Sequence, residues 1–418
     1  MIKNYLKIAL KVLGRRKFFT FISLFGISVT LLVLLVATAL LDHVFSAQTP
    51  EVHADRMLGV YQLTMRGPDD SENSHPGYGF LDRYVRPMAK LPNVERVALV
   101  TETRTVVSYL NGRKIQSAMR RADGEFWRVL AFDFVEGEPF TVADNEGGRF
   151  VAVISETARE RFFGGSPAVG QTIEADGQRF RVVGVVRDVP VLRYASAADL
   201  WVPITTAKTS AYKEEWLGAF TALILARNSA DLPQIKAEFQ SRLRDAEHHL
   251  PDPKTFTTLI AGADTLPEGA ARIFLPGEQV ANPGGRMRAA LLALMLGFML
   301  LPTINLVNIN LSRILDRASE IGVRRAFGAS ARTLVGQFLI ENLVLTLIGA
   351  AIGLVLAAGV LRAFNVSGIL PNTHLQLNLR IFADGLGIAV FFGLFSGVYP
   401  AWRMSKLHPV EALRGRSA

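Results

Sequence analysis

The chain has 418 residues, 50% of them hydrophobic, and a formal net charge of +9 at pH 7. Its mean hydropathy is positive, which is unusual for a soluble globular protein. It contains no cysteine, which excludes a disulfide framework, a thiolate metal site, a cysteine nucleophile and a lipid-modified cysteine. The first features to search for are therefore membrane-spanning segments.

Several apolar segments are long enough to cross a bilayer as a helix, which takes about 20 residues. They are residues 18–41, 289–311, 334–361 and 381–400. The first two contain no ionisable side chain, the third contains only Glu341, and the fourth contains only Asp384. Buried helices of soluble proteins rarely reach such lengths, so we predict four transmembrane helices.

A basic leader precedes the first apolar segment, as it does in a secretory signal peptide. The leader contains Lys3, Lys7, Lys11, Arg15, Arg16 and Lys17. The apolar run that follows is much longer than the about 7 to 15 residues of a signal peptide. We therefore interpret residues 18–41 as an uncleaved anchor.

The distribution of Lys and Arg predicts the orientation in the membrane. Basic residues outnumber acidic ones in residues 1–17, 312–333 and 401–418, so we expect these three stretches in the cytoplasm. Residues 42–288 and the short loop 362–380 are then expected outside. This pattern accounts for the basic charge, and no nucleic-acid surface is needed to explain it.

The long outer segment shows mixed α and β patterns. Asn111-Gly112 indicates a hairpin, and Asp176-Gly177 indicates another. Residues 150–189 are typical of a small α+β subdomain, namely a strand, a helix that begins at Ser155 and a hairpin. Further along, residues 222–226 predict a strand, 232–250 an amphipathic helix and 251–282 extended structure. The predicted fold class is thus a four-helix, one-plus-three integral membrane protein with a large mixed α+β extracytoplasmic domain between helices 1 and 2.

Motifs for chemistry are lacking in the sequence. It has no phosphate-binding loop of the G-x-x-x-x-G-K-[ST] type, no H-E-x-x-H metal motif and no G-x-S-x-G nucleophile elbow. We therefore assign no catalytic, metal or cofactor-binding residue. Within the spans, Glu341 is interpreted as an interhelical hydrogen-bonding group rather than part of an ion path. Close helix contact is expected at Gly349, Gly353, Gly393 and Gly397, either within one subunit or between two.

The segment between the second and third predicted spans reads RILDRASEIGVRRAFGASARTLVG over residues 313–336. Glu320 and Arg324 have the i, i+4 spacing of a helical ion pair, and Ser330 is placed to cap the next helix. A solvated basic connector that follows the positive-inside rule would explain these features on physical grounds alone.

Three parts of the sequence resemble a known family. EIGVRRAFGA at residues 320–329, followed by QFLIE at 337–341, is similar to the "EIGIRRALGA" hallmark of FtsX-like permease domains. GVYPAWR at 397–403 and HPVEALR at 408–414 resemble the end of that domain. In the outer segment, FFGG at 162–165, VG at 169–170 and VVGVVRD at 182–188 resemble MacB-type periplasmic domains.

The resemblance implies the permease subunit of a MacB-type ABC transporter in a bacterial inner membrane, with both termini cytoplasmic. It implies cytoplasmic ATPase subunits that bind the ATP, a second permease subunit in a homo- or heterodimer, and a periplasmic adaptor with an outer-membrane channel. The MacB protein carries an N-terminal ATPase domain, whereas this sequence starts at the membrane helix, so we expect the ATPase on a separate chain. The expected ATPase-coupling residues are Arg317, Glu320, Ile321, Gly322, Arg324, Arg325 and Gly328.

The mechanism that the resemblance implies is mechanotransmission, in which ATP hydrolysis inside drives movement outside and exports a substrate. Lipoprotein extraction is a close variant. The alternative from another class is an FtsX-like activator of a cell-wall hydrolase, although the outer domain of FtsX is much smaller. Residues 289–418 would form the FtsX-like permease domain, and residues 42–288 the MacB-type domain.

Overall fold

The computed structural model divides into two compact units, which we call the helical unit and the sheet unit. The helical unit comprises residues 1–43, 289–369 and 374–418, and the sheet unit comprises residues 44–288 and 370–373. Within these ranges the structure describes residues 17–69, 71–110, 113–275, 282–316, 323, 327, 330–369, 371–373, 375 and 379–405.

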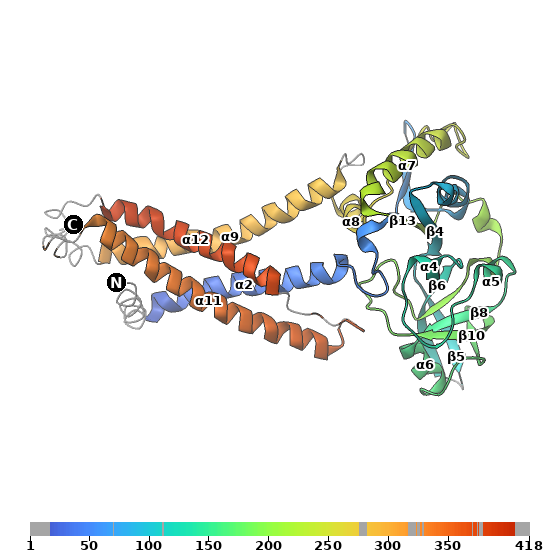
Figure 1. The fold of residues 1–418 in the computed structure, drawn as a ribbon, viewed down its shortest axis with the longest axis horizontal. Helices are drawn as coiled ribbons and strands as arrows, with labels where there is room; N and C mark the ends of the chain where they lie inside the picture. The colour runs from blue at the N-terminus through green and yellow to red at the C-terminus, as the bar shows by residue number, and fades with distance from the viewer. Residues whose placement is uncertain are drawn as a thin grey trace. The chain divides into compact units, whose positions relative to one another are not determined.

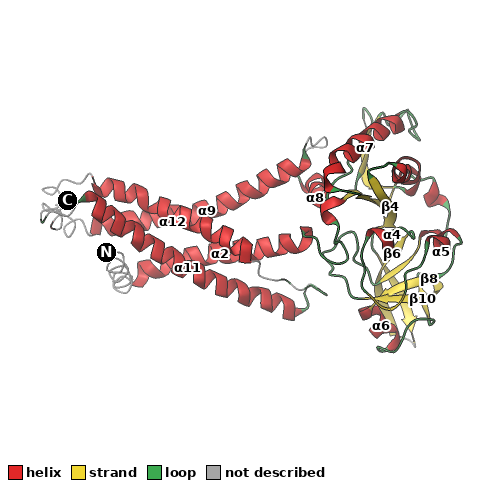
Figure 2. Cartoon of the chain, viewed as in Figure 1, coloured by secondary structure: helices red, strands yellow, loops and turns green. Residues whose placement is uncertain are grey.

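Long helices make up the described part of the helical unit (Figures 1 and 2). They are α2 (Lys17–Phe45), α9 (Pro283–Asp316), α11 (Ala331–Ser367) and α12 (Leu379–Ser405). Each contains one of the apolar segments predicted to span the membrane and continues beyond it at both ends. Among the described residues, α2 and residues 335–367 of α11 are long and apolar enough to cross a bilayer.

One apolar core joins three of these helices. Ile27 and Leu31 of α2 are buried together with Val344 and Leu345 of α11 and Ala389 of α12. Tight apolar packing of this kind holds helices together where lipid removes the usual hydrophobic driving force. The three helices therefore form a packed bundle.

The sheet unit contains a large mixed sheet. Its central path runs β1-β13-β4-β6-β11-β8-β10-β7, with β5 paired to β6 and β9 paired to β10. The pairs β10–β8 and β11–β6 are parallel and the other neighbours are antiparallel. The strands are β1 (Met57–Val60), β4 (Val94–Thr101), β5 (Arg104–Leu110), β6 (Arg113–Ala122), β7 (Phe134–Gly137), β8 (Val151–Ser155), β9 (Thr172–Ala175), β10 (Gln178–Val186), β11 (Leu200–Pro203) and β13 (Phe220–Ala226).

A second sheet of the same unit has the order β12-β3-β2-β14. Its strands are β2 (Leu63–Arg66), β3 (Ser71–Pro76), β12 (Leu217–Gly218) and β14 (Thr258–Ala261). The helices of the unit are α3 (Tyr78–Phe80), α4 (Phe126–Val129), α5 (Val142–Glu146), α6 (Glu156–Phe163), α7 (Leu232–Glu247) and α8 (Leu266–Phe274). Short helical turns are η1 (Ala54–Arg56), η2 (Leu81–Val85), η3 (Arg86–Lys90), η4 (Ile204–Thr206), η5 (Ala211–Lys213) and η6 (Ser229–Asp231).

Residues 150–189 contain the predicted strand, helix and hairpin as β8, α6, β9 and β10. The side chain of Ser155 caps α6 by accepting from the Ala158 N–H at 3.1 Å. Asp176 and Gly177 both have positive φ, which is the geometry of the tight two-residue hairpin that their sequence predicts. Because β8 and β10 pair with each other and β8 with β11, these elements are continuous with the large sheet.

The prediction of extended structure over residues 251–282 is wrong for residues 266–274, which form α8. Thr265 and Glu268 form a capping box, in which each side chain bonds the backbone N–H of the other. Pro267 fits in the first turn because no intrahelical donor is needed there. The Pro and Gly content of this stretch concealed a helix start that the Thr-x-x-Glu spacing could have shown.

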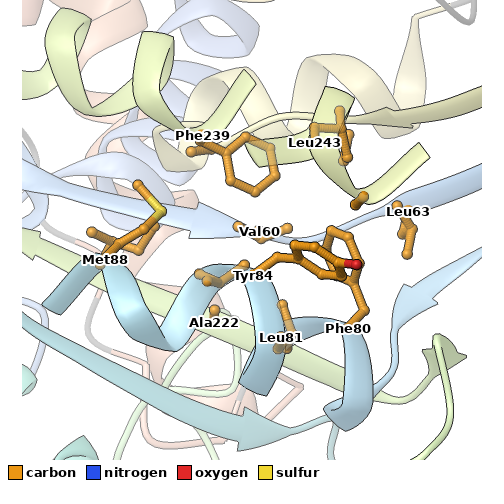
Figure 3. Packing of buried hydrophobic residues seen from close by; sticks show 14 of the residues in the cluster. Val60, Leu63, Phe80, Leu81, Tyr84, Met88, Ala222, Phe239 and Leu243 are labelled. Carbon is orange, nitrogen blue, oxygen red and sulfur yellow. The ribbon is translucent and has the colours of Figure 1, made fainter. Parts of the chain in front are cut away.

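The core of the sheet unit is apolar and aromatic. Phe239 and Leu243 of α7 pack over Val60 of β1, together with Phe80 of α3 and Tyr84 of η2 (Figure 3). Spacing of four residues along α7 places its two side chains on one helix face, as the amphipathic pattern predicts. This core holds α3, η2 and α7 against β1.

Candidate functional site

Most of the predicted coupling segment falls outside the described residues. This holds for Arg317, Glu320, Ile321, Gly322, Arg324, Arg325 and Gly328. Of their neighbours, Phe327 donates its N–H to the Val323 carbonyl at 3.1 Å, which is one helical turn. Phe327 is 89% exposed, and Val323 is also exposed. We call residues 317–330, between α9 and α11, the connector. At Phe327 the connector has a large apolar side chain that is exposed.

α11 begins as its sequence predicts. Ser330 lies at the N-cap of the helix, and its hydroxyl accepts from the Thr333 N–H at 3.2 Å. This bond satisfies one of the N–H groups that the first turn of a helix leaves without a partner. The capping role predicted for Ser330 is therefore confirmed.

Glu341 lies inside the helical unit and is only 4% exposed. Gln337, one turn earlier on α11, donates from Nε2 to Glu341 Oε1 at 3.0 Å. Asn342 and Thr346 of the same helix are buried as well. Polar side chains in a bilayer face protein and hydrogen bond there, because lipid offers no partner. The Gln337–Glu341 bond lies within α11, and the interhelical hydrogen bond expected for Glu341 stays a prediction.

Glycines of α11 lie against α2. A Cβ atom at Gly349 would come within 2.8 Å of Ile27 Cγ2, and one at Gly353 would come within 2.9 Å of the Ser28 carbonyl oxygen. Gly393 of α12 lies in the same way against Thr346, whose Oγ1 would overlap with an added Cβ. These glycines allow close approach between helices of one chain. Gly397 also lies in α12.

The described residues of the sheet unit form a groove. The groove has a volume of about 470 Å³ and is lined by both signs of charge, with Arg120 and Arg161 beside Glu102 and Asp199. Burial lowers the pKa of Arg120 to about 10, so the guanidinium remains charged at neutral pH. Among the described residues no three His, Asp or Glu side chains are grouped to hold a metal ion.

In sequence, the sheet unit is inserted between α2 and the other long helices, an order that defines a class of membrane protein with one large inserted domain. Two family models match the chain in that order: the MacB-like periplasmic core domain over residues 20–242 and the FtsX-like permease C-terminal region over residues 292–409. The first match alone covers more than half of the chain. The protein belongs to the MacB-like, FtsX-like family of ABC transporter permeases.

Individual relatives agree with this assignment. The chain is 27% identical over 330 residues to the macrolide export ATP-binding/permease protein MacB of Bdellovibrio bacteriovorus, covering 78% of this chain and 48% of that protein. It is 23% identical over 339 residues to the uncharacterized ABC transporter permease YknZ of Bacillus subtilis, covering 80% of this chain and 79% of YknZ. The chain thus spans about half the length of that MacB relative.

A solved structure of the YknZ extracellular domain aligns with 49% of this chain and 98% of that domain, at 15% identity and a TM-score of 0.36. The periplasmic region of MacB from Actinobacillus actinomycetemcomitans aligns with 53% of this chain and 96% of that region, at 16% identity and a TM-score of 0.34.

Proposed function

We propose that the chain is the membrane subunit of a MacB-type ABC transporter and couples ATP hydrolysis by a separate cytoplasmic ATPase to movement of the sheet unit outside. In this proposal α9 and α12 complete a membrane part of four spans, and both termini lie in the cytoplasm of a bacterial cell. The observation that supports it best is the order of the two family matches along one chain.

The proposal places the ATPase on a separate chain, and the name of one relative supports this part of it. The YknZ relative, of which the chain covers 79%, is named as a permease alone. ATP is then bound by the partner, and this chain supplies no catalytic residue. A second permease subunit, identical or homologous, would complete the transporter.

The mechanism assigned to the chain is that of a lever. The helices of the bundle pack closely through Gly349, Gly353 and Gly393, so a displacement at the connector is carried along them rather than absorbed. Work is done on the substrate outside the membrane, with export through a periplasmic adaptor and an outer-membrane channel as the leading version. The relative named for macrolide export fits this version.

The experiment that tests the proposal is co-purification of the ATPase. Replacing Arg324 and Arg325 together by Glu should abolish recovery of an ABC ATPase with the permease, because the connector then repels the acidic partner groups it is proposed to meet. The matched control reverses Arg179 and Arg181, two exposed arginines of β10 in the sheet unit.

The control should retain the ATPase at the wild-type level. Recovery of an ABC ATPase with the Arg324/Arg325 double variant at the wild-type level would refute the docking role of the connector. Recovery of a cell-wall hydrolase on the sheet unit, rather than an adaptor, would favour the FtsX-like activator instead.

A further inference from the structure

An irregular segment of the sheet unit, residues 189–199, connects β10 to β11, and we call it the hub. It contains no strand or regular helix, yet Arg193 is 1% exposed and Ser196 is fully buried. Ala195 is buried beside them. Loops normally lie at the surface, since their backbone groups need water. A loop buried to this degree therefore contacts other parts of the chain on several sides.

One side of the hub holds the chain that follows α2. Arg193 Nη1 donates to the Ser46 carbonyl at 2.7 Å and lies 3.5 Å from Glu51 Oε2. Ser196 Oγ donates to Glu51 Oε1 at 2.7 Å. The Glu51 and Arg193 side chains are each only 1% exposed. The exit of the first apolar helix is thus fixed to the hub by a buried ion pair and two hydrogen bonds.

A second side of the hub meets the connection between α11 and α12. The Val191 N–H donates to the Pro371 carbonyl at 3.5 Å. Thr373 is buried, and Pro371 and Asn372 line the 470 Å³ groove together with Val191. Residues 371–373 belong to the compact sheet unit although they lie between two helices of the helical unit in sequence. The hub therefore contacts residues 46–51 and 371–373, two stretches of the sheet unit that lie next in sequence to helices of the helical unit.

The third side of the hub is anchored to the large sheet. Arg120 of β6 donates from Nε to the Ala197 carbonyl at 2.9 Å, from Nη2 to the Tyr194 carbonyl, and from Nη1 to the Thr101 carbonyl of β4 at 2.9 Å. Asp199 exchanges two further bonds with Ala118 of β6, at 2.7 and 2.8 Å. One buried guanidinium thereby ties the hub to the middle of the sheet.

The Glu51–Arg193 pair is suited to a joint rather than to simple stabilisation. Buried ion pairs contribute little net stability, but loss of one partner leaves an uncompensated buried charge. Arg193 Nε and Nη2 have no hydrogen-bond partner within the described residues. A guanidinium with unused donors can exchange one contact for another when residues 46–51 shift, so it can hold its carboxylate in more than one position.

We propose that the hub, residues 189–199, acts as a joint that transmits movement to the sheet unit from two places, the end of α2 and the α11–α12 connection. The Arg193–Glu51 ion pair holds the chain after α2 to the hub, and Arg120 holds the hub to the large sheet. The inference rests on the proposed lever function and names the residues at which the lever acts. The groove beside the hub gives the joint free volume in which to move.

The first arm of the test needs no nucleotide and no ATPase. Hydrogen exchange of the full-length permease in detergent should show that Arg193→Met lowers, by about tenfold or more, the protection of the amides that donate to residues 46–51 and 371–373. These are the N–H groups of Ala54 and Ala131, which donate to the Glu51 and Pro50 carbonyls, and of Val191, which donates to the Pro371 carbonyl. The matched control is Arg187→Met, which removes a 72% exposed arginine that lies 3.8 Å from Asp133. That control should leave both segments unchanged. Ser196→Ala, which removes one bond to Glu51, is a milder variant in case Arg193→Met does not fold.

The second arm uses the permease assembled with its ATPase, with and without ATP plus vanadate. Wild type should show nucleotide-dependent exchange in β4 and β6, and Arg193→Met should lose that response although it hydrolyses ATP when vanadate is absent. Unchanged protection of both segments in Arg193→Met and Ser196→Ala would overturn the joint, and so would a wild-type nucleotide response in Arg193→Met.

Absence of any nucleotide response in the wild-type sheet unit would instead count against the proposed lever function. The first arm would still decide whether the hub holds the two segments.

Discussion

Gly353→Ala is the substitution whose effect can be worked out most directly from the helical unit. An added Cβ would lie 2.9 Å from the Ser28 carbonyl oxygen and 3.1 Å from Leu31 Cβ, where ordinary contacts begin at 3.4 Å. The oxygen belongs to the backbone of α2, so it cannot swing aside, and α2 and α11 must separate. Overpacking of this kind typically costs about 1 to 3 kcal/mol.

The matched control is Gly359→Ala on the same helix, because a Cβ there meets no heavy atom within 4 Å. Both substitutions gain the helix propensity of alanine, about 0.8 to 1 kcal/mol, so their difference isolates the close approach. Unfolding in mixed micelles, followed by helical circular dichroism, should place Gly353→Ala below Gly359→Ala by about 1 to 3 kcal/mol. Equal unfolding free energies would refute the packing of α11 on α2.

Two further predictions concern topology and acid stability. In the cysteine-free chain, Ser330→Cys should resist a membrane-impermeant thiol reagent in intact cells, while Ser229→Cys should react once the outer membrane is permeabilised; labelling at residue 330 would reverse the proposed orientation. Glu136 accepts from the Ala168 N–H at 3.0 Å and from Arg159 at 2.6 Å, and these bonds lower the pKa of its carboxyl below the usual 4.5. The ionised Glu136 carboxylate contributes about 1 kcal/mol to the free energy of unfolding, as is typical of a partly exposed pair. This contribution is present above pH 4.5 and is lost as the pH falls through the lowered pKa. The stability gap between wild type and Glu136→Gln should therefore close in acid, and a gap that persists at low pH would contradict this assignment.

Local sequence signals predicted the elements of the sheet unit better than their pairing. Ser155 and Asp176-Gly177 act within a few residues of themselves, so the helix and hairpin they mark could be derived from sequence. The partners of β8 could not, because β10 and β11 are brought to it by contacts far apart along the chain.

The same limit applies to the hub. Glu51 and Arg193 are 142 residues apart and nothing in their local sequence marks either as buried. Arg120 bonds to main-chain carbonyls, which any residue can supply, so its role leaves no pattern in the sequence. The connector motif, by contrast, was recognised by resemblance alone, and its coupling role stays a prediction.

The most direct test of the lever function is nucleotide-dependent hydrogen exchange in the wild-type permease assembled with its ATPase. The proposed function places the ATPase and its nucleotide on the cytoplasmic side, so a lever predicts that ATP plus vanadate changes protection within residues 44–288 as well as in the helical unit. Changes confined to the helical unit, with exchange in residues 44–288 identical in the two states of a preparation that hydrolyses ATP when vanadate is absent, would contradict the account.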